Sequence, residues 1–226
     1  MRGSSAAPPL IREALFSASS NLFSESGLDL DQIGIWEDLG DIEFSGEIEE
    51  ESFKKIKTFV KDVLVSDQKL VSLGGDHSVS WPILDAHLDK WDALDILHID
   101  AHPDLYDSLL GNKLSHASPF ARIMETGRAS RLVQVGIRTL NKHQREQAEK
   151  FGVEIYQMKD LTKLSSLSFS KPVYCSIDID ALDPAYAPGV SHFEPGGLST
   201  RQLIDCLNGF KGRLIGADIV EYNPKR

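Results

Sequence analysis

The sequence DAHPD at residues 100–104 is the point around which the predicted fold is organised. It follows the mostly apolar stretch ALDILHI at residues 93–99, which predicts a buried strand. Because side chains alternate between the two sides of an extended chain, Asp100, His102 and Asp104 are expected to share one side. Carboxylates and an imidazole that converge where a buried strand ends are destabilising unless a positive charge neutralises them. The stretch therefore predicts a divalent metal ion at this strand end.

Other predicted strands also end in metal-compatible or acidic side chains. The turn GGDHS places His77 after one strand, and the sequence SIDID places Asp178 and Asp180 after another. Taken alone, GGDHS is more typical of a loop with a hydrogen-bonded histidine, but the clusters together indicate one shared site. Glu221 adds a carboxylate at the end of a fourth strand. These four strands are predicted at residues 69–73, 93–99, 172–177 and 213–220.

Predicted strands and helices alternate along the chain, which favours a single α/β domain over residues 1–226 with a mostly parallel central sheet and helices on both faces. In such sheets, sites form at the carboxyl ends of the strands. The predicted helices cover residues 8–20, 47–65, 80–88, 117–126, 142–151 and 199–207. Two more strands are predicted at residues 131–138 and 153–157, a further short strand within residues 33–42, and a serine-rich connector at residues 162–171.

The composition narrows the class of protein. The chain has 226 residues, 41% hydrophobic and 26% charged, as in an ordinary globular domain. Its net charge of −10 argues against a nucleic-acid partner and suits a cationic substrate. Its longest apolar runs are too short for a membrane span, and no export signal is recognised. Cys175 and Cys206 are interpreted as reduced, buried thiols, which predicts a reducing compartment such as the cytoplasm.

The six candidate donors are two imidazoles and four carboxylates. This set differs from a structural zinc site, which would use thiolates. Carboxylates favour manganese, magnesium or iron, and the imidazoles argue against magnesium. Six ligands exceed what one metal with an open position needs, so we expect two metals that share bridging carboxylates. Such a pair activates water, which predicts hydrolysis at an electron-poor carbon or phosphorus centre.

A series of motifs then resembles a known family. In chain order they are GGDHS, DAHPDLYD, GNKLSHASPFARI, QVGIR, SIDIDALDPAYAPGVSHFEPGGLS and ADIVEYNP. The series resembles the ureohydrolases, the arginases and agmatinases, and is most similar to the plant-type arginases. The resemblance runs from about residue 8 to residue 226. It implies a three-layer α/β/α fold, two manganese ions per chain, and cleavage of a guanidinium group to release urea.

The resemblance also implies roles for single residues. One manganese ion would be held by His77, Asp100, Asp104 and Asp178, and the other by His102, Asp100, Asp178 and Asp180. Asp104 would also hydrogen-bond to the nucleophile, His116 would move protons at the mouth of the site, and Glu221 would pair with the substrate guanidinium. A planar cation with paired N–H donors suits a bidentate carboxylate.

The substrate contacts differ from those of animal-type arginases. Where those enzymes have an asparagine after the DAHPD-type cluster, this chain has Tyr106, and the segment after GIR is Thr139-Leu140-Asn141. Candidate polar contacts are Asn112, Ser115 and Asn141. The predicted substrate is L-arginine, which would give urea and ornithine. The alternatives are agmatinase activity, another guanidino or formimino hydrolysis, and an inactive fragment that serves only in binding or assembly.

Three further expectations rest on the resemblance. Family members form trimers and hexamers, so a homo-oligomer is expected. Family members usually extend further at both ends, so the chain is expected to lack terminal strands. Plant-type members are organellar, which makes an organelle the alternative to the predicted cytoplasmic location.

Overall fold

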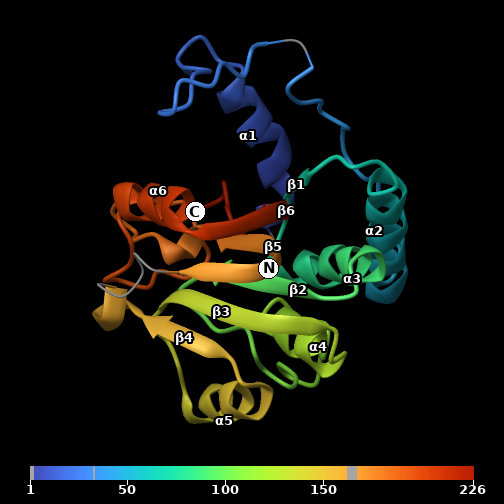
Figure 1. Cartoon of the computed structure of the whole chain (residues 1–226), viewed down its shortest axis with the longest axis vertical. Coiled ribbons are helices and arrows are strands. Elements are labelled where there is room, and N and C mark those ends of the chain that lie inside the picture. Colours follow the sequence, from blue (N-terminus) through green and yellow to red (C-terminus); the bar gives the residue numbers. More distant parts are fainter. Residues whose placement is uncertain (1–2, 33, 162–166) are drawn as a thin grey trace.

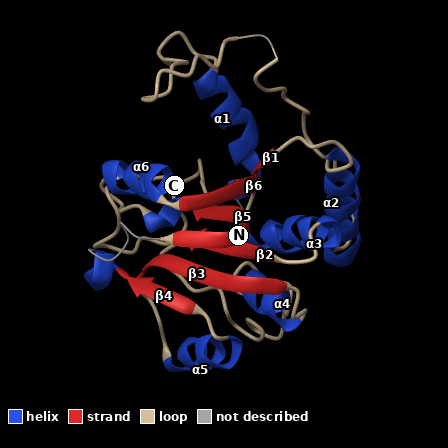
Figure 2. Cartoon of the chain, viewed as in Figure 1, coloured by secondary structure: helices blue, strands red, loops and turns tan. Residues whose placement is uncertain are grey.

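The computed structural model describes residues 3–32, 34–161 and 167–226. The described part of the chain contains one six-stranded sheet in which all neighbouring strands are parallel (Figures 1 and 2). Its strand order is β1-β6-β5-β2-β3-β4. The strands are β1 (Leu70–Leu73), β2 (Leu94–Ile99), β3 (Ala129–Ile137), β4 (Glu154–Gln157), β5 (Ser168–Asp178) and β6 (Lys211–Val220).

Helices cover both faces of this sheet, which confirms the predicted three-layer α/β fold. One core packs the first face against α2 to α5, and a second core packs the other face against α6. Residues of β2 alternate between them, with Ile96 in the first core and Leu97 in the second. The helices are α1 (Ala7–Leu15), α2 (Glu49–Val63), α3 (Ser80–Lys90), α4 (Pro119–Glu125), α5 (Lys142–Phe151) and α6 (Thr200–Gly209).

Local sequence explains where several helices begin. Ser199 and Gln202 form a reciprocal capping box at the start of α6, which satisfies backbone N–H groups that have no partner inside the helix. Asn141 caps α5 in a similar way, and Gly152 ends that helix in the left-handed conformation. These caps fix the ends of the helices, and so the lengths of the loops that reach the sheet edge.

The strand order creates a crevice beside β2. From β2 the chain continues to β3 on one side, whereas from β5, the other neighbour of β2, it continues to β6 in the opposite direction. Loops that leave two adjacent parallel strands in opposite directions open a crevice at their carboxyl ends. The segments 100–104 and 178–180 both begin at this point.

A row of polar side chains crosses the centre of the sheet. Gln134 on β3 pairs in register with His98 on β2, His98 with Ser176 on β5, and Ser176 with Asp218 on β6. All four are fully buried. Residues in register on neighbouring strands project to the same face, so the four side chains form one continuous line inside the protein. We call them the central polar row.

The structure differs from two expectations. No strand forms in residues 34–42, which are irregular and belong to the segment after α1 that projects beyond the β1 edge of the sheet (Figure 1). Residues 168–171, expected in a connector, instead begin β5, while residues 162–166 lie outside the described residues. Among the helices of the described residues, none is long and apolar enough to cross a membrane.

Candidate metal centre

His77 lies at the start of a short 3-10 helix, η2 (His77–Val79), just after β1. Its side chain is fully buried. The Nδ1 atom lies 3.2 Å from Asp100 Oδ2, 3.0 Å from Asp104 Oδ2 and 3.2 Å from Asp178 Oδ2. One imidazole nitrogen therefore faces three carboxylates that come from the ends of two strands.

His102 faces a second group of carboxylates. Its Nδ1 atom lies 3.2 Å from Asp180 Oδ2 and 3.4 Å from Asp100 Oδ1. The two oxygens of Asp100 thus face different imidazoles, because Oδ2 is the oxygen near His77. Ligand atoms of Asp100, Asp178 and Asp180 also lie within 4.8 Å of one another. This is the arrangement expected of a carboxylate placed between two cations.

The hydrogen bond of His77 Nε2, the ring nitrogen that points away from the carboxylates, shows where that nitrogen's hydrogen lies. Ser176 Oγ donates to Asp218 Oδ1 at 2.6 Å, and His77 Nε2 lies 2.9 Å from the same Ser176 Oγ. Since the hydroxyl proton is already used, Ser176 accepts from His77, and Nε2 carries the hydrogen. Nδ1 is thereby the nitrogen that faces the carboxylates, and a metal ion there would take the place of the proton that Nδ1 carries in the charged imidazole. A nitrogen that faces three buried carboxylates fits a metal ligand.

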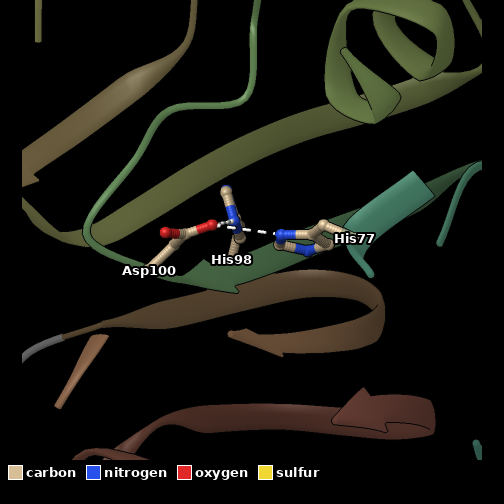
Figure 3. A group of neighbouring side chains, drawn as sticks. All are labelled: His77, His98 and Asp100. Atoms are coloured by element: carbon tan, nitrogen blue, oxygen red, sulfur yellow. Dashed lines mark hydrogen bonds and ion pairs between the residues drawn. The ribbon is translucent and has the colours of Figure 1, made fainter. Parts of the chain in front are cut away.

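The side chain of His98 lies close to those of His77 and Asp100 (Figure 3). Its hydrogen bonds, however, assign it a role other than metal binding. Gln134 Nε2 donates to His98 Nδ1 at 3.0 Å and to the carbonyl of Pro103 at 2.6 Å. The hydrogen of the imidazole is therefore on Nε2, which donates to Asp100 Oδ2 at 2.7 Å. His98 is a donor that orients Asp100 rather than a candidate ligand.

The electrostatics of the cluster favour a cation. Burial opposes a charged imidazole at His77, but the surrounding carboxylates outweigh it and raise its pKa well above the usual value. Burial also opposes a charged imidazole at His102, but Asp100 and Asp180 outweigh it and raise the pKa of His102 to about 12. Burial and neighbouring Asp100 raise the pKa of Asp104 to about 6. These pKa shifts indicate an excess of negative charge, which a divalent ion would neutralise. The side chains offer the oxygen and nitrogen donors that suit an ion such as manganese.

A cavity of about 230 Å³ opens above the cluster. His102, Asp178 and Asp180 line it together with Asp104, and so do His116 and Glu221. The structure therefore gathers His77, Asp100, His102, Asp104, Asp178, Asp180, His116 and Glu221 in or beside one site.

Glu221 is held at the end of β6 by its own hydrogen bonds. Its Oε1 accepts from the backbone N–H of His77 at 3.1 Å, and Oε2 accepts from Ser4 Oγ at 3.4 Å. Burial, with Asp76 nearby, raises the pKa of Glu221 to about 7. Glu221 and Asp104 both have positive φ, 66° and 48°. Strained backbone of this kind concentrates at functional sites.

The three candidate substrate contacts do not line the cavity. Asn112 donates to the carboxylate of Glu49, at 3.3 and 3.2 Å to its two oxygens. Ser115 Oγ lies 3.1 Å from Ser118 Oγ. Asn141 caps α5 and donates to the hydroxyl of Tyr106 at 2.5 Å. Each has a local partner that accounts for its position.

Seven further residues, to which the sequence analysis assigned no role in the site, also line the cavity. They are Tyr106, Leu109, Ala117, Thr139, Gln144, His192 and Glu194. The sequence does carry a signal for two of them, because His192 and Glu194 alternate in a loop bounded by proline and glycine. The ring of His192 lies near those of His102 and His116, with centroid distances of 5.3 Å and 6.0 Å.

A parallel sheet that gathers buried carboxylates and imidazoles beneath a cavity at its switch point defines an α/β enzyme with a site suited to metal ions. The model of the Arginase family matches residues 1–226. The chain belongs to the arginase family, and it is a hydrolase that acts on guanidino compounds.

Individual relatives agree with this placement. The chain is 46% identical to "Arginase 1, mitochondrial" of Oryza sativa subsp. indica, across 100% of this chain and 71% of the relative. It is 36% identical to an agmatinase of Bacillus cereus, across 83% of this chain and 67% of the relative. The solved arginase from Medicago truncatula superposes with a TM-score of 0.95 at 45% identity, across 100% of this chain and 76% of that one.

Proposed function

We propose that residues 1–226 act as one unit that hydrolyses L-arginine to urea and ornithine with two manganese ions. The observation that carries the proposal is that Asp100 turns one oxygen toward Nδ1 of His77 and the other toward Nδ1 of His102. A single carboxylate between two imidazoles suits a pair of cations better than one.

The gathered donors divide into two sets. The first ion would be held by His77, Asp100, Asp104 and Asp178, and the second by His102, Asp100, Asp178 and Asp180. When bound, the two ions would supply Lewis-acid activation of water near neutral pH. Water adds to the guanidinium carbon, the bond from that carbon to the side-chain nitrogen breaks, and that nitrogen leaves as the amine of ornithine.

The residues around the cavity would bind and orient the substrate. Glu221 offers two carboxylate oxygens to the guanidinium. Burial raises the pKa of Glu221 to about 7, so a cationic partner would stabilise its charged form. Asp104 would accept a hydrogen bond from the attacking water. His116 lines the same cavity, and burial lowers its pKa, so it is neutral and able to accept a proton that it later gives to the departing amine.

Replacing Glu221 by glutamine tests its part in substrate binding. The amide oxygen can still accept from the N–H of His77, so the loop is preserved while the charge is lost. We expect kcat/KM for arginine to fall by about 30-fold or more, because removing one partner of a buried charge pair costs about 2–5 kcal/mol. Metal content, measured on the same samples, should stay at the wild-type value. An unchanged kcat/KM would exclude contact between Glu221 and the guanidinium.

The choice between substrates needs a direct assay. Agmatine keeps the guanidinium and the amine of arginine but lacks the carboxylate. Greater identity to the arginases than to the agmatinases supports arginine. We expect manganese-loaded protein to release urea from arginine at least 10-fold faster than from agmatine at equal concentration. The reverse ratio would favour agmatinase. Turnover of formiminoglutamate alone would favour formimino hydrolysis, and no turnover of any of the three would favour an inactive chain.

Assembly and location complete the proposal. We propose a homo-oligomer, and the resemblance to the family favours a trimer or hexamer. The exposed side chains of Phe16, Phe23 and Trp36, on the segment that projects beyond the β1 edge of the sheet, support self-association. Light scattering of the purified protein tests this. The names of the plant relatives support a mitochondrion or chloroplast over the cytoplasm that the sequence favoured, and imaging of a fluorescent fusion tests that.

A further inference from the structure

His102 and His77 have different hydrogen-bond partners for Nε2, the ring nitrogen that points away from the carboxylate cluster. His102 Nε2 lies 3.4 Å from Glu194 Oε1, on the loop that follows β5. An ionised carboxylate can only accept, so the imidazole donates from Nε2, and Nδ1 is left to face Asp100 and Asp180. His102 therefore turns Nδ1 toward the carboxylates as His77 does, but its Nε2 atom has a different partner.

The loop that carries Glu194 is tightly held. Arg138 Nε donates to the carbonyl of Glu194 at 2.9 Å, and Arg138 Nη2 donates to it at 2.7 Å. The same Nη2 donates to the carbonyl of Asp180 at 2.7 Å. One guanidinium therefore joins the backbone of Glu194 to that of the candidate ligand Asp180.

A second set of hydrogen bonds closes the loop. Asp183 Oδ2 accepts from the backbone N–H groups of Gly196 and Gly197 at 2.7 and 3.2 Å. The carboxylate of Glu194 is thus carried by a backbone that is fixed on both sides. A fixed backbone is what a residue needs in order to orient another side chain.

We infer that Glu194 is a positioning residue for the second metal ion, and that it acts by holding His102 in its metal-binding tautomer. The inference rests on the proposed two-metal function. Outer carboxylates that accept from a metal-bound histidine usually change metal affinity 10- to 100-fold. Glu194 would therefore act on one ion of the pair.

The two metal positions differ in their exposure to solvent. His77 is backed by Ser176 and Asp218, both fully buried, whereas the side chain of Glu194 is 33% exposed at the cavity. Each imidazole has its own outer partner, so the two positions can be weakened separately. Ser176→Ala serves as the matched control, because it removes the outer partner of His77 and leaves Glu194 in place.

The experiment measures bound manganese rather than turnover. Wild-type protein, Glu194→Ala, Glu194→Gln and Ser176→Ala are loaded with manganese, dialysed against a graded metal buffer, and analysed for metal per chain. At a free manganese concentration at which wild type keeps about two ions per chain, we expect Glu194→Ala to keep about one. The second ion should bind to Glu194→Ala about 10- to 100-fold less tightly than to wild type. Glu194→Gln should recover much of the loss, because its amide oxygen still accepts from Nε2.

A double-mutant cycle identifies the ion that is lost. In a His102→Ala background, Glu194→Ala should cause no further loss of manganese, whereas Ser176→Ala should. In a His77→Ala background, Ser176→Ala should cause no further loss of manganese, whereas Glu194→Ala should. Thermal unfolding without metal checks that each variant folds as the wild type does.

Other results would overturn the inference. If Glu194→Ala keeps two ions with wild-type affinity and only raises KM for arginine, Glu194 contacts the substrate instead. If wild type keeps two ions and the loss in Glu194→Ala is the same with and without His102, Glu194 acts through the loop and not through the imidazole. If wild type binds no manganese, the proposed function fails, and the inference fails with it.

Discussion

Replacing Asp100 by asparagine is expected to lower urea release from arginine by about 1000-fold or more. The amide can turn its one remaining oxygen toward His77 or toward His102, but not toward both, and its NH2 group would oppose the donor on His98. At least one ion should be lost, and with it several kcal/mol of transition-state stabilisation. The measurement is kcat/KM together with bound manganese.

A matched control is available on β2, the strand that Asp100 follows. Asp95 is buried near the other end of β2, where its carboxylate accepts from the backbone N–H of Lys171 at 3.4 Å. Asp95→Asn removes one buried charge without touching the cluster, so its kcat/KM should stay within about threefold of wild type. If Asp100→Asn keeps more than a tenth of wild-type activity, the bridging position assigned to Asp100 is wrong.

Removing manganese should destabilise the protein as well as stop turnover. Ligand at 1000 times its dissociation constant stabilises the folded state by about 4 kcal/mol. For a chain of this size, 1 kcal/mol corresponds to about 2–4 °C in Tm, so chelation should lower Tm by roughly 8–16 °C. Differential scanning calorimetry with and without chelator measures the shift, and added manganese should reverse it.

The variant Asp100→Asn provides the internal comparison for this shift. Because it is expected to bind less metal, chelator should lower its Tm by clearly less than it lowers that of wild type. Equal shifts in the two proteins would mean that the stabilising ion binds somewhere other than the cluster.

The fold and much of the site follow from the sequence for one geometric reason. In a parallel sheet every strand reaches the same edge with its carboxyl end, so residues just after the strands are brought together regardless of their separation in the chain. That is why His77, Asp100 and Asp178 could be predicted to meet. Asp180 adds a second donor from the short 3-10 helix η4 (Ile179–Ala181), which directly follows β5.

The hydrogen bonds behind the candidate ligands could not be predicted in the same way. Single polar residues such as Ser176 and Asp218 lie within strands that otherwise look apolar, and only the register between strands shows that they touch. The register depends on packing of the whole sheet, and residue spacing does not report it. The same limit applies to loops, where Asn112 turns to Glu49 and Glu194 reaches His102.

The segment after α1 shows a different limit. Apolar residues among acids in residues 33–42 predict a short strand, but the described part of this segment is irregular and leaves Trp36 exposed. A strand pattern forms a strand only where a neighbouring strand can pair with it.

The pairing of β1 with β6 has a consequence for how the protein matures in the cell. Within the described residues, Leu70 to Leu73 pair with Gly216 to Ile219, so β1 cannot dock on the sheet until the ribosome has made β6, far along the chain. Contacts of such long sequence separation form late and slowly. His77, which follows β1, would therefore join Asp100 and Asp178 only after β6 has been made, so the proposed metal centre would be completed late in the folding of the chain.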